Sequence, residues 1–89
     1  MLTYKQLERI AKGSANHRRI QILDLLEKNP ELSVSEISTA IKSDIKNVSE
    51  HIRKLAIAGL LVKRNQGNNI RYKLTPRGIS ILQFYRIME

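Results

Sequence analysis

The side chains with the most evident chemistry lie between residues 45 and 58, where apolar residues recur with a helical period. Ile45, Val48, Ile52 and Leu55 are spaced i, i+3, i+7 and i+10, which is typical of the buried stripe of a helix. The other faces of this helix carry hydrogen-bonding and charged side chains, namely Lys46, Asn47, Ser49, Glu50, Arg53 and Lys54. Asn and Arg can each bind one base through two hydrogen bonds, Glu can accept from cytosine, and Lys and Ser can contact bases or phosphates. We therefore expect Lys46, Asn47, Ser49, Glu50 and Arg53 to read base edges.

A second group of donors follows in a predicted β-hairpin. Residues 60–64 are typical of a strand, residues 65–69 have the Gly and Asn content of a turn, and residues 70–74 alternate between apolar and basic side chains. We expect this hairpin, together with Lys54, to contact the nucleic-acid backbone through Lys63, Arg64, Gln66, Asn68, Asn69 and Arg71.

The positive charge of the chain is concentrated in the same region. The 89 residues contain 16 Lys and Arg against 8 Asp and Glu, a net charge of +8. Residues 41–73 alone carry eight basic and two acidic side chains, a balance of +6. A run of charge is often only a solvated face. Here it coincides with the polar helix and the hairpin, which favours a polyanion as the partner.

Capping signals predict the elements that position these side chains. Thr3 with Gln6 opens a first helix that we expect Gly13 to end, and Asn16 caps a second helix that ends before Asn29-Pro30. A third helix begins after Ser33 with Glu36, the polar helix follows after Ser43-Asp44 and ends at Gly59, and a last helix begins at Thr75-Pro76. Residues 32–34 could form a very short strand before the third helix.

This order predicts a mainly α (α+β) fold of the winged helix-turn-helix class. The helix-turn-helix covers about residues 33–59, the two-stranded wing covers about residues 60–74, and residues 1–89 form a single domain. In this arrangement the second helix of the pair can enter the major groove of DNA while the hairpin reaches the backbone or the minor groove.

Several other classes of protein are disfavoured. The chain has no Cys, the Gly-x-Ser-x-Gly and Walker motifs are absent, and so short a chain has little room for both a core and a cleft. We therefore expect no enzyme activity and no cofactor. The two histidines, His17 and His51, are far apart, and no metal site is expected. No apolar run approaches the ~20 residues of a membrane span and no signal-peptide core is present, so a cytoplasmic location is expected.

The terminal helices indicate self-association. The last helix is apolar on more than one side, and one of these sides would stay exposed on a monomer. A two-fold dimer would bury it. The alternative is that this helix only covers its own core. The expected interface residues are Tyr4, Leu7, Ile81, Phe84, Tyr85 and Met88.

Three segments carry a family resemblance. Residues 16–23 (NHRRIQIL), 31–37 (ELSVSEI) and 47–55 (NVSEHIRKL) resemble the helix-opening motif, the following segment and the recognition helix of ArsR-type winged-helix repressors. The match covers about residues 15–75, and residues 74–78 (LTPRG) are also similar to MarR-type domains. The resemblance implies a homodimeric transcriptional regulator that binds a two-fold operator.

The same resemblance disfavours metal sensing. Metal-sensing members of that family have cysteines where this chain has Ser33 and Ser35, and hydroxyl groups do not replace thiolates as ligands of soft metals. Other members use carboxylate and histidine pairs on the last helix, but residues 76–88 contain neither Asp nor His.

The function that we predict is that of a transcriptional regulator that binds double-stranded DNA sequence-specifically and represses by binding a two-fold operator as a homodimer. Two alternatives stay open, a sequence-neutral architectural binder of nucleic acid and a winged helix that binds another protein. The sequence leaves an effector or a protein partner unidentified.

Overall fold

Each helix of the computed structural model, which describes residues 1–88, begins after a polar residue whose side chain accepts a backbone N–H. The elements are α1 (Tyr4–Ser14), α2 (His17–Lys28), α3 (Val34–Ile41), α4 (Ile45–Ile57), β1 (Leu61–Gln66), β2 (Asn69–Leu74) and α5 (Pro76–Ile87). The caps are Thr3, Asn16, Ser33, Asp44 and Thr75, and Thr3 and Ser33 form full capping boxes with Gln6 and Glu36. The predicted mainly α, winged helix-turn-helix fold is confirmed.

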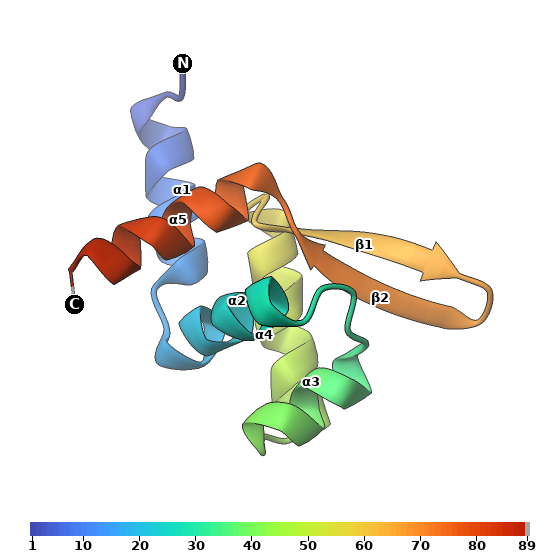
Figure 1. Ribbon diagram of the computed structural model, residues 1–89. Helices are drawn as coiled ribbons and strands as arrows, with labels where there is room; N and C mark the ends of the chain where they lie inside the picture. The colour runs from blue at the N-terminus through green and yellow to red at the C-terminus, as the bar shows by residue number, and fades with distance from the viewer. Residues whose placement is uncertain (89) are drawn as a thin grey trace.

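The core lies where α2, α3 and α4 meet the base of the hairpin. Ile22, Leu23, Ile37, Leu55 and Leu60 are fully buried there. In Figure 1, α4 runs from the end of the helical body that holds α3 toward the end that holds α1 and α5, and the hairpin projects to one side. The polar helix and the hairpin therefore rest on a shared core while their outer surfaces face solvent.

The C-terminus of α4 is a Schellman turn that leads directly into the wing. The backbone N–H of Leu60 donates to Leu55 and that of Gly59 donates to Ala56, while Gly59 has a φ of +79°. Thr75 then ties the far end of β2 back to this turn, because its hydroxyl donates to the Gly59 carbonyl at 2.6 Å. The wing is thus fixed at its root to the end of α4.

Four local predictions were wrong. Gly13 does not end α1, which continues to Ser14, because Gly13 lies inside the helix against Ala58 of α4. Ile45 is 51% exposed although its spacing places it on the apolar stripe, since it is the first residue of α4 and extends past the core. The loop between the strands is only Gly67-Asn68, because β1 and β2 pair as far as Gln66 and Asn69. Residues 32–34 contribute a single bridge between Leu32 and Tyr72 rather than a strand.

Candidate nucleic-acid interface

Helix α4 presents the predicted base-reading side chains together on one exposed surface. Val48, Ile52 and Leu55 are buried and fix the rotation of the helix about its axis. The five predicted residues are all exposed: Lys46, Asn47, Ser49, Glu50 and Arg53. The structure therefore brings the five together on the outer side of the second helix of the helix-turn-helix.

Two of these side chains are paired with each other. The Nε of Arg53 donates to Glu50 at 3.1 Å, and the guanidinium lowers the pKa of the Glu50 carboxyl below its usual value. Both side chains are about half exposed, at 58% and 49%. A base or phosphate that approached this surface could replace Glu50 as the partner of Arg53. The cost in free energy would be small, because exposed ion pairs contribute little to stability.

The wing holds its predicted residues at the surface, with Arg71 as the exception. Lys63, Arg64, Gln66, Asn68 and Asn69 are exposed, whereas Arg71 is half-buried. Arg71 donates to the Glu31 carbonyl oxygen at 2.8 Å and forms an ion pair with Glu36 at 2.9 Å. This arginine therefore ties the wing to α3 in the free protein.

Sequence reasoning missed the two glutamates that hold the wing. Arg64 and Arg71 face each other across the hairpin, and their mutual repulsion is relieved because Glu31 pairs with Arg64 at 2.7 Å and Glu36 pairs with Arg71. The Tyr72 N–H also donates to the Leu32 carbonyl at 2.9 Å. More than 30 positions separate these partners along the chain, and no local sequence signal relates them.

The flank of α4 that faces α1 and α2 carries Lys54 and His51. Lys54 is exposed, and His51 is half-buried, with its Nδ1 accepting from the Nε of Arg19 at 3.2 Å. Burial, together with the charges of Arg19 and Lys54, lowers the pKa of His51 below its usual value. A neutral His51 is the form that can accept this hydrogen bond. The imidazole thus positions Arg19 of α2 beside α4, a contact that sequence reasoning missed.

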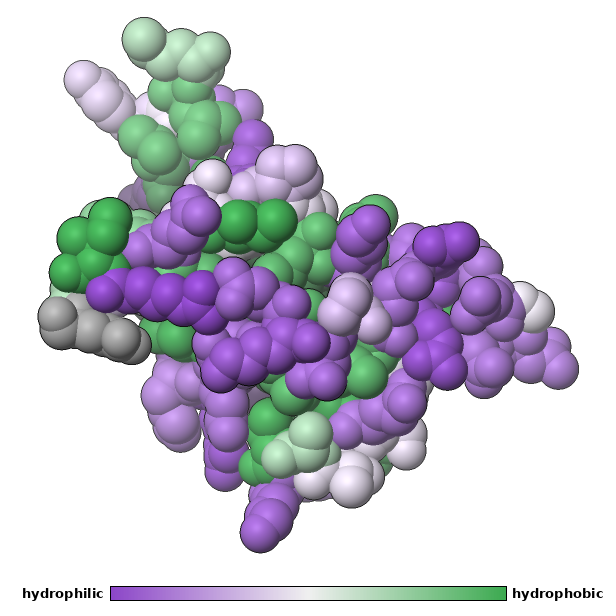
Figure 2. Space-filling model, viewed as in Figure 1, coloured by the Kyte–Doolittle hydropathy of each residue, from purple (hydrophilic) through white to green (hydrophobic). Residues whose placement is uncertain are grey.

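The residues predicted for self-association lie on α1 and α5 but differ in exposure. Tyr4, Leu7, Phe84 and Met88 are exposed, at 92%, 49%, 54% and 62%. Ile81 is half-buried against the core, and the Tyr85 hydroxyl bonds to the Ser14 hydroxyl, which ties α5 to α1. Figure 2 shows hydrophobic residues gathered on the side of the molecule where α1 and α5 lie, while the hairpin is hydrophilic.

Residues 1–88 contain neither a candidate metal site nor a membrane-spanning helix. Among them, no three His, Cys, Asp or Glu side chains are grouped so that they could hold a metal ion. None of the described helices is long and apolar enough to cross a membrane. Ser33, one of the two serines at the cysteine positions of metal sensors, is occupied as the N-cap of α3.

The fold and the exposed side of α4 define the class of winged helix-turn-helix domains. The family model of the bacterial regulatory proteins of the arsR family matches residues 16–63. The chain belongs to this family, as the sequence resemblance predicted, and the family consists of regulators rather than enzymes.

Individual relatives agree with this assignment. The chain is 34% identical over 77 residues to an HTH-type transcriptional regulator of Mycobacterium tuberculosis, a match that covers 86% of this chain and 34% of that protein. It is 36% identical over 62 residues to the arsenical resistance operon repressor of Escherichia coli, which covers 70% of this chain and 53% of the repressor. The chain thus spans about a third and about half of these two relatives.

A solved structure extends the likeness to nearly the whole chain. The homodimeric winged helix-turn-helix DNA-binding domain of a possible ArsR-family transcriptional regulator from Mycobacterium bovis superposes with a TM-score of 0.84 at 29% identity. The match covers 94% of this chain and 78% of that domain. The arrangement of α1 and α5 around the winged helix is therefore shared with a domain that forms a homodimer.

Proposed function

We propose that this protein is a transcriptional regulator that binds specific double-stranded DNA as a homodimer and represses by occluding a promoter. The observation that carries the proposal is the exposed polar side of α4, which stands beside a basic wing on a common core. In this proposal residues 1–89 act as one DNA-binding domain in the cytoplasm, where α4 enters the major groove.

The proposed roles of the side chains follow from their positions. Lys46, Asn47 and Ser49 are free to meet base edges, and Arg53 can do so after it leaves Glu50. Lys54 and the exposed wing residues supply the contacts to the sugar-phosphate backbone. Arg71 contributes mainly by holding the wing in place, because Glu31 and Glu36 engage it.

Dimer formation is supported by the apolar surface that α1 and α5 share. A hollow of about 370 Å³ between these helices is lined almost entirely by apolar groups, among them Leu7, Ile10, Ile81 and Phe84. A second copy that covered this surface would bury it and would present two α4 helices to the DNA. The two α4 helices of such a dimer would bind two half-sites about one helical turn of DNA apart, and the two-fold symmetry would make these half-sites an inverted repeat.

Selection of binding sites from a random duplex library tests this proposal. The selection is made at about 150 mM salt, which suppresses purely electrostatic binding. We expect an enriched inverted repeat. Tight binding at low salt without an enriched sequence would instead support an architectural role, and the absence of binding at either salt would support a protein partner.

A further inference from the structure

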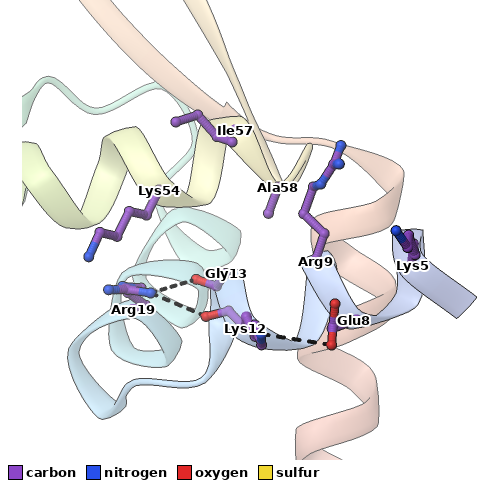
Figure 3. Close-up of a pocket in the computed structure, with 9 residues that line it drawn as sticks. All are labelled: Lys5, Glu8, Arg9, Lys12, Gly13, Arg19, Lys54, Ile57 and Ala58. Atoms are coloured by element: carbon purple, nitrogen blue, oxygen red, sulfur yellow. Dashed lines mark hydrogen bonds and ion pairs between the residues drawn. The ribbon is translucent and has the colours of Figure 1, made fainter.

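A basic hollow lies between α1 and α4, and Lys54 is the only one of its lining residues for which the sequence predicted a contact. The hollow has a volume of about 470 Å³ and is lined by basic side chains from three helices. Figure 3 shows them around the hollow, with one acidic residue, Glu8, among them. The basic residues are Lys5, Arg9 and Lys12 of α1, Arg19 of α2 and Lys54 of α4.

Helix α1 separates its charged and apolar side chains onto different faces. Lys5, Arg9 and Lys12 are spaced i, i+4 and i+7, so they follow one another along the side that lines this hollow. Leu7 and Ile10 line the apolar hollow that α1 forms with α5. One side of α1 is thus available to a second copy while its basic side faces α4.

The basic charge of the hollow is only partly neutralised. Glu8 forms an exposed contact of 3.7 Å with Lys12. Arg19 is held in place by the carbonyl oxygens of Lys12 and Gly13 and by His51, none of which carries a negative charge. The carboxylate of Glu50, on which the charges of Arg19 and Lys54 act, is engaged by Arg53. The hollow therefore keeps an excess of positive charge.

The hollow lies beside α4, the helix proposed to enter the major groove of DNA. Ile57 of α4 lines this hollow and also a second one, on the other flank of α4, to which the wing contributes Lys63. A helix seated in the major groove, which is about 12 Å wide, has a phosphate backbone on each side. The wing supplies cations on one side of α4, and the hollow supplies them on the other.

We infer that the basic hollow between α1 and α4 binds the phosphates of the DNA strand that lies opposite the wing. This inference rests on the proposed function and enlarges the predicted contact surface to include α1. Phosphate contacts of this kind position a recognition helix without reading sequence. They also release counterions, so each lost contact lowers the salt dependence of binding by about one unit of slope.

A double variant of the hollow and a control variant on α2 test the inference. Arg9→Gln with Lys12→Gln removes two cations of the hollow, including one that has an exposed i,i+4 partner, Glu8. The control, Lys28→Gln, removes a charge of α2 that likewise has an i,i+4 partner, Asp24. Circular dichroism and thermal unfolding establish that both variants fold.

The measurement is the slope of log affinity against log salt for one duplex. We expect the Arg9/Lys12 variant to lose about two units of slope and the control to keep the slope of the wild type. Equal slopes in all three proteins, or equal losses in both variants, would overturn the inference and leave the proposed function standing. A wild-type protein that bound no duplex would overturn both.

Discussion

Ion pairs between side chains hold the arginines of the free interface at defined positions. Arg53 pairs with Glu50 on α4, and Arg64 and Arg71 of the wing pair with Glu31 and Glu36. Each pair is at least partly exposed, so phosphates can replace the carboxylates. In the proposed function, DNA binding would exchange the carboxylate partners of Arg53 and Arg64 for groups of the DNA, and the uncharged Asn47 would give the most direct measure of base reading.

Replacement of Asn47 by Ala should lower the preference for the operator over random DNA by about 1–3 kcal/mol, because it removes a bidentate contact to a base. Asn47 is exposed on α4, so the fold should be unaffected. Competition binding with the selected operator and a scrambled duplex measures the effect. Gln83→Ala, an exposed amide on α5, is the control. Wild-type discrimination by Asn47→Ala would contradict the assignment of this residue.

At the scale of the elements, close contacts of backbone determine where α5 can lie. Gly78 is buried in the first turn of α5, and a Cβ at this position would meet the backbone carbonyl of Leu60. The Gly78 N–H donates to the Thr75 hydroxyl at 3.0 Å, so the N-terminus of α5 is held against the turn that begins the wing. A single glycine thereby couples the position of α5 to that of the wing.

We expect Gly78→Ala to reduce the free energy of unfolding by about 1–3 kcal/mol, since the added methyl group must displace backbone rather than a mobile side chain. Urea unfolding monitored by circular dichroism measures the loss. Ser80→Ala, an exposed change on the same helix, should leave the stability nearly unchanged. If Gly78→Ala were as stable as the wild type, the first turn of α5 and the turn at Leu60 could move apart without loss of stability, and the proposed coupling would be contradicted.

The other end of α5 is fixed by an ionic clamp. Arg86 donates to Asp24 at 2.7 Å and to Glu27 at 2.8 Å, both on α2. These hydrogen bonds lower the pKa of the Asp24 carboxyl below its usual 3.8 and that of Glu27 below its usual 4.5. Because the two pKa values are lower in the folded state than in the unfolded state, the clamp stabilises the fold fully at pH values above the usual pKa values. This contribution is lost as the pH falls through the lowered ones.

Arg86→Gln should therefore reduce the stability at about pH 7, and the difference from wild type should shrink by about pH 3 as the carboxylates become protonated. Urea unfolding at the two pH values provides the comparison. Arg77→Gln, at an exposed position in the first turn of α5, is the control. A difference that stayed constant with pH would show that Arg86 acts through packing of its aliphatic part instead.

At the scale of the whole molecule, the protein presents a basic surface on α4 and the wing and a separate apolar surface between α1 and α5. The α4 and wing surface is basic, whereas exposed apolar side chains of α1 and α5 gather on the other side, as Figure 2 shows. A monomer would leave this apolar surface in water. Pairing through α1 and α5 would turn two α4 helices toward one duplex, so self-association and DNA binding would use separate surfaces.

Phe84→Glu should convert the proposed dimer into a monomer, because it places a charge in the apolar surface between α1 and α5. Sedimentation velocity at micromolar concentration measures the change. Ile57→Glu introduces the same charge at an exposed isoleucine of α4 and should leave the dimer intact. A monomeric wild-type protein, or a dimeric Phe84→Glu variant, would contradict the proposed interface.

Local rules determined much of this protein. The helix starts followed from Thr3, Asn16, Ser33, Thr75 and the pair Ser43-Asp44, of which the structure uses Asp44, because these side chains satisfy backbone N–H groups only a few residues away. The buried stripe of α4 followed from its periodicity, and the exposed polar side is what remains when that stripe is buried. These features depend on near neighbours in the chain, so a sequence contains the information that predicts them.

Tertiary structure decided the features that depend on distant partners. Gly13 continues α1 because Ala58 of α4 packs against it, although a glycine near a helix end usually predicts termination. Arg71 is engaged by Glu36, and the basic side of α1 lines a hollow with α4, although residues 1–40 show a charge balance of only +1. A charge balance counted along the chain averages over faces that folding separates, and only the packing of the helices shows which charges share a surface.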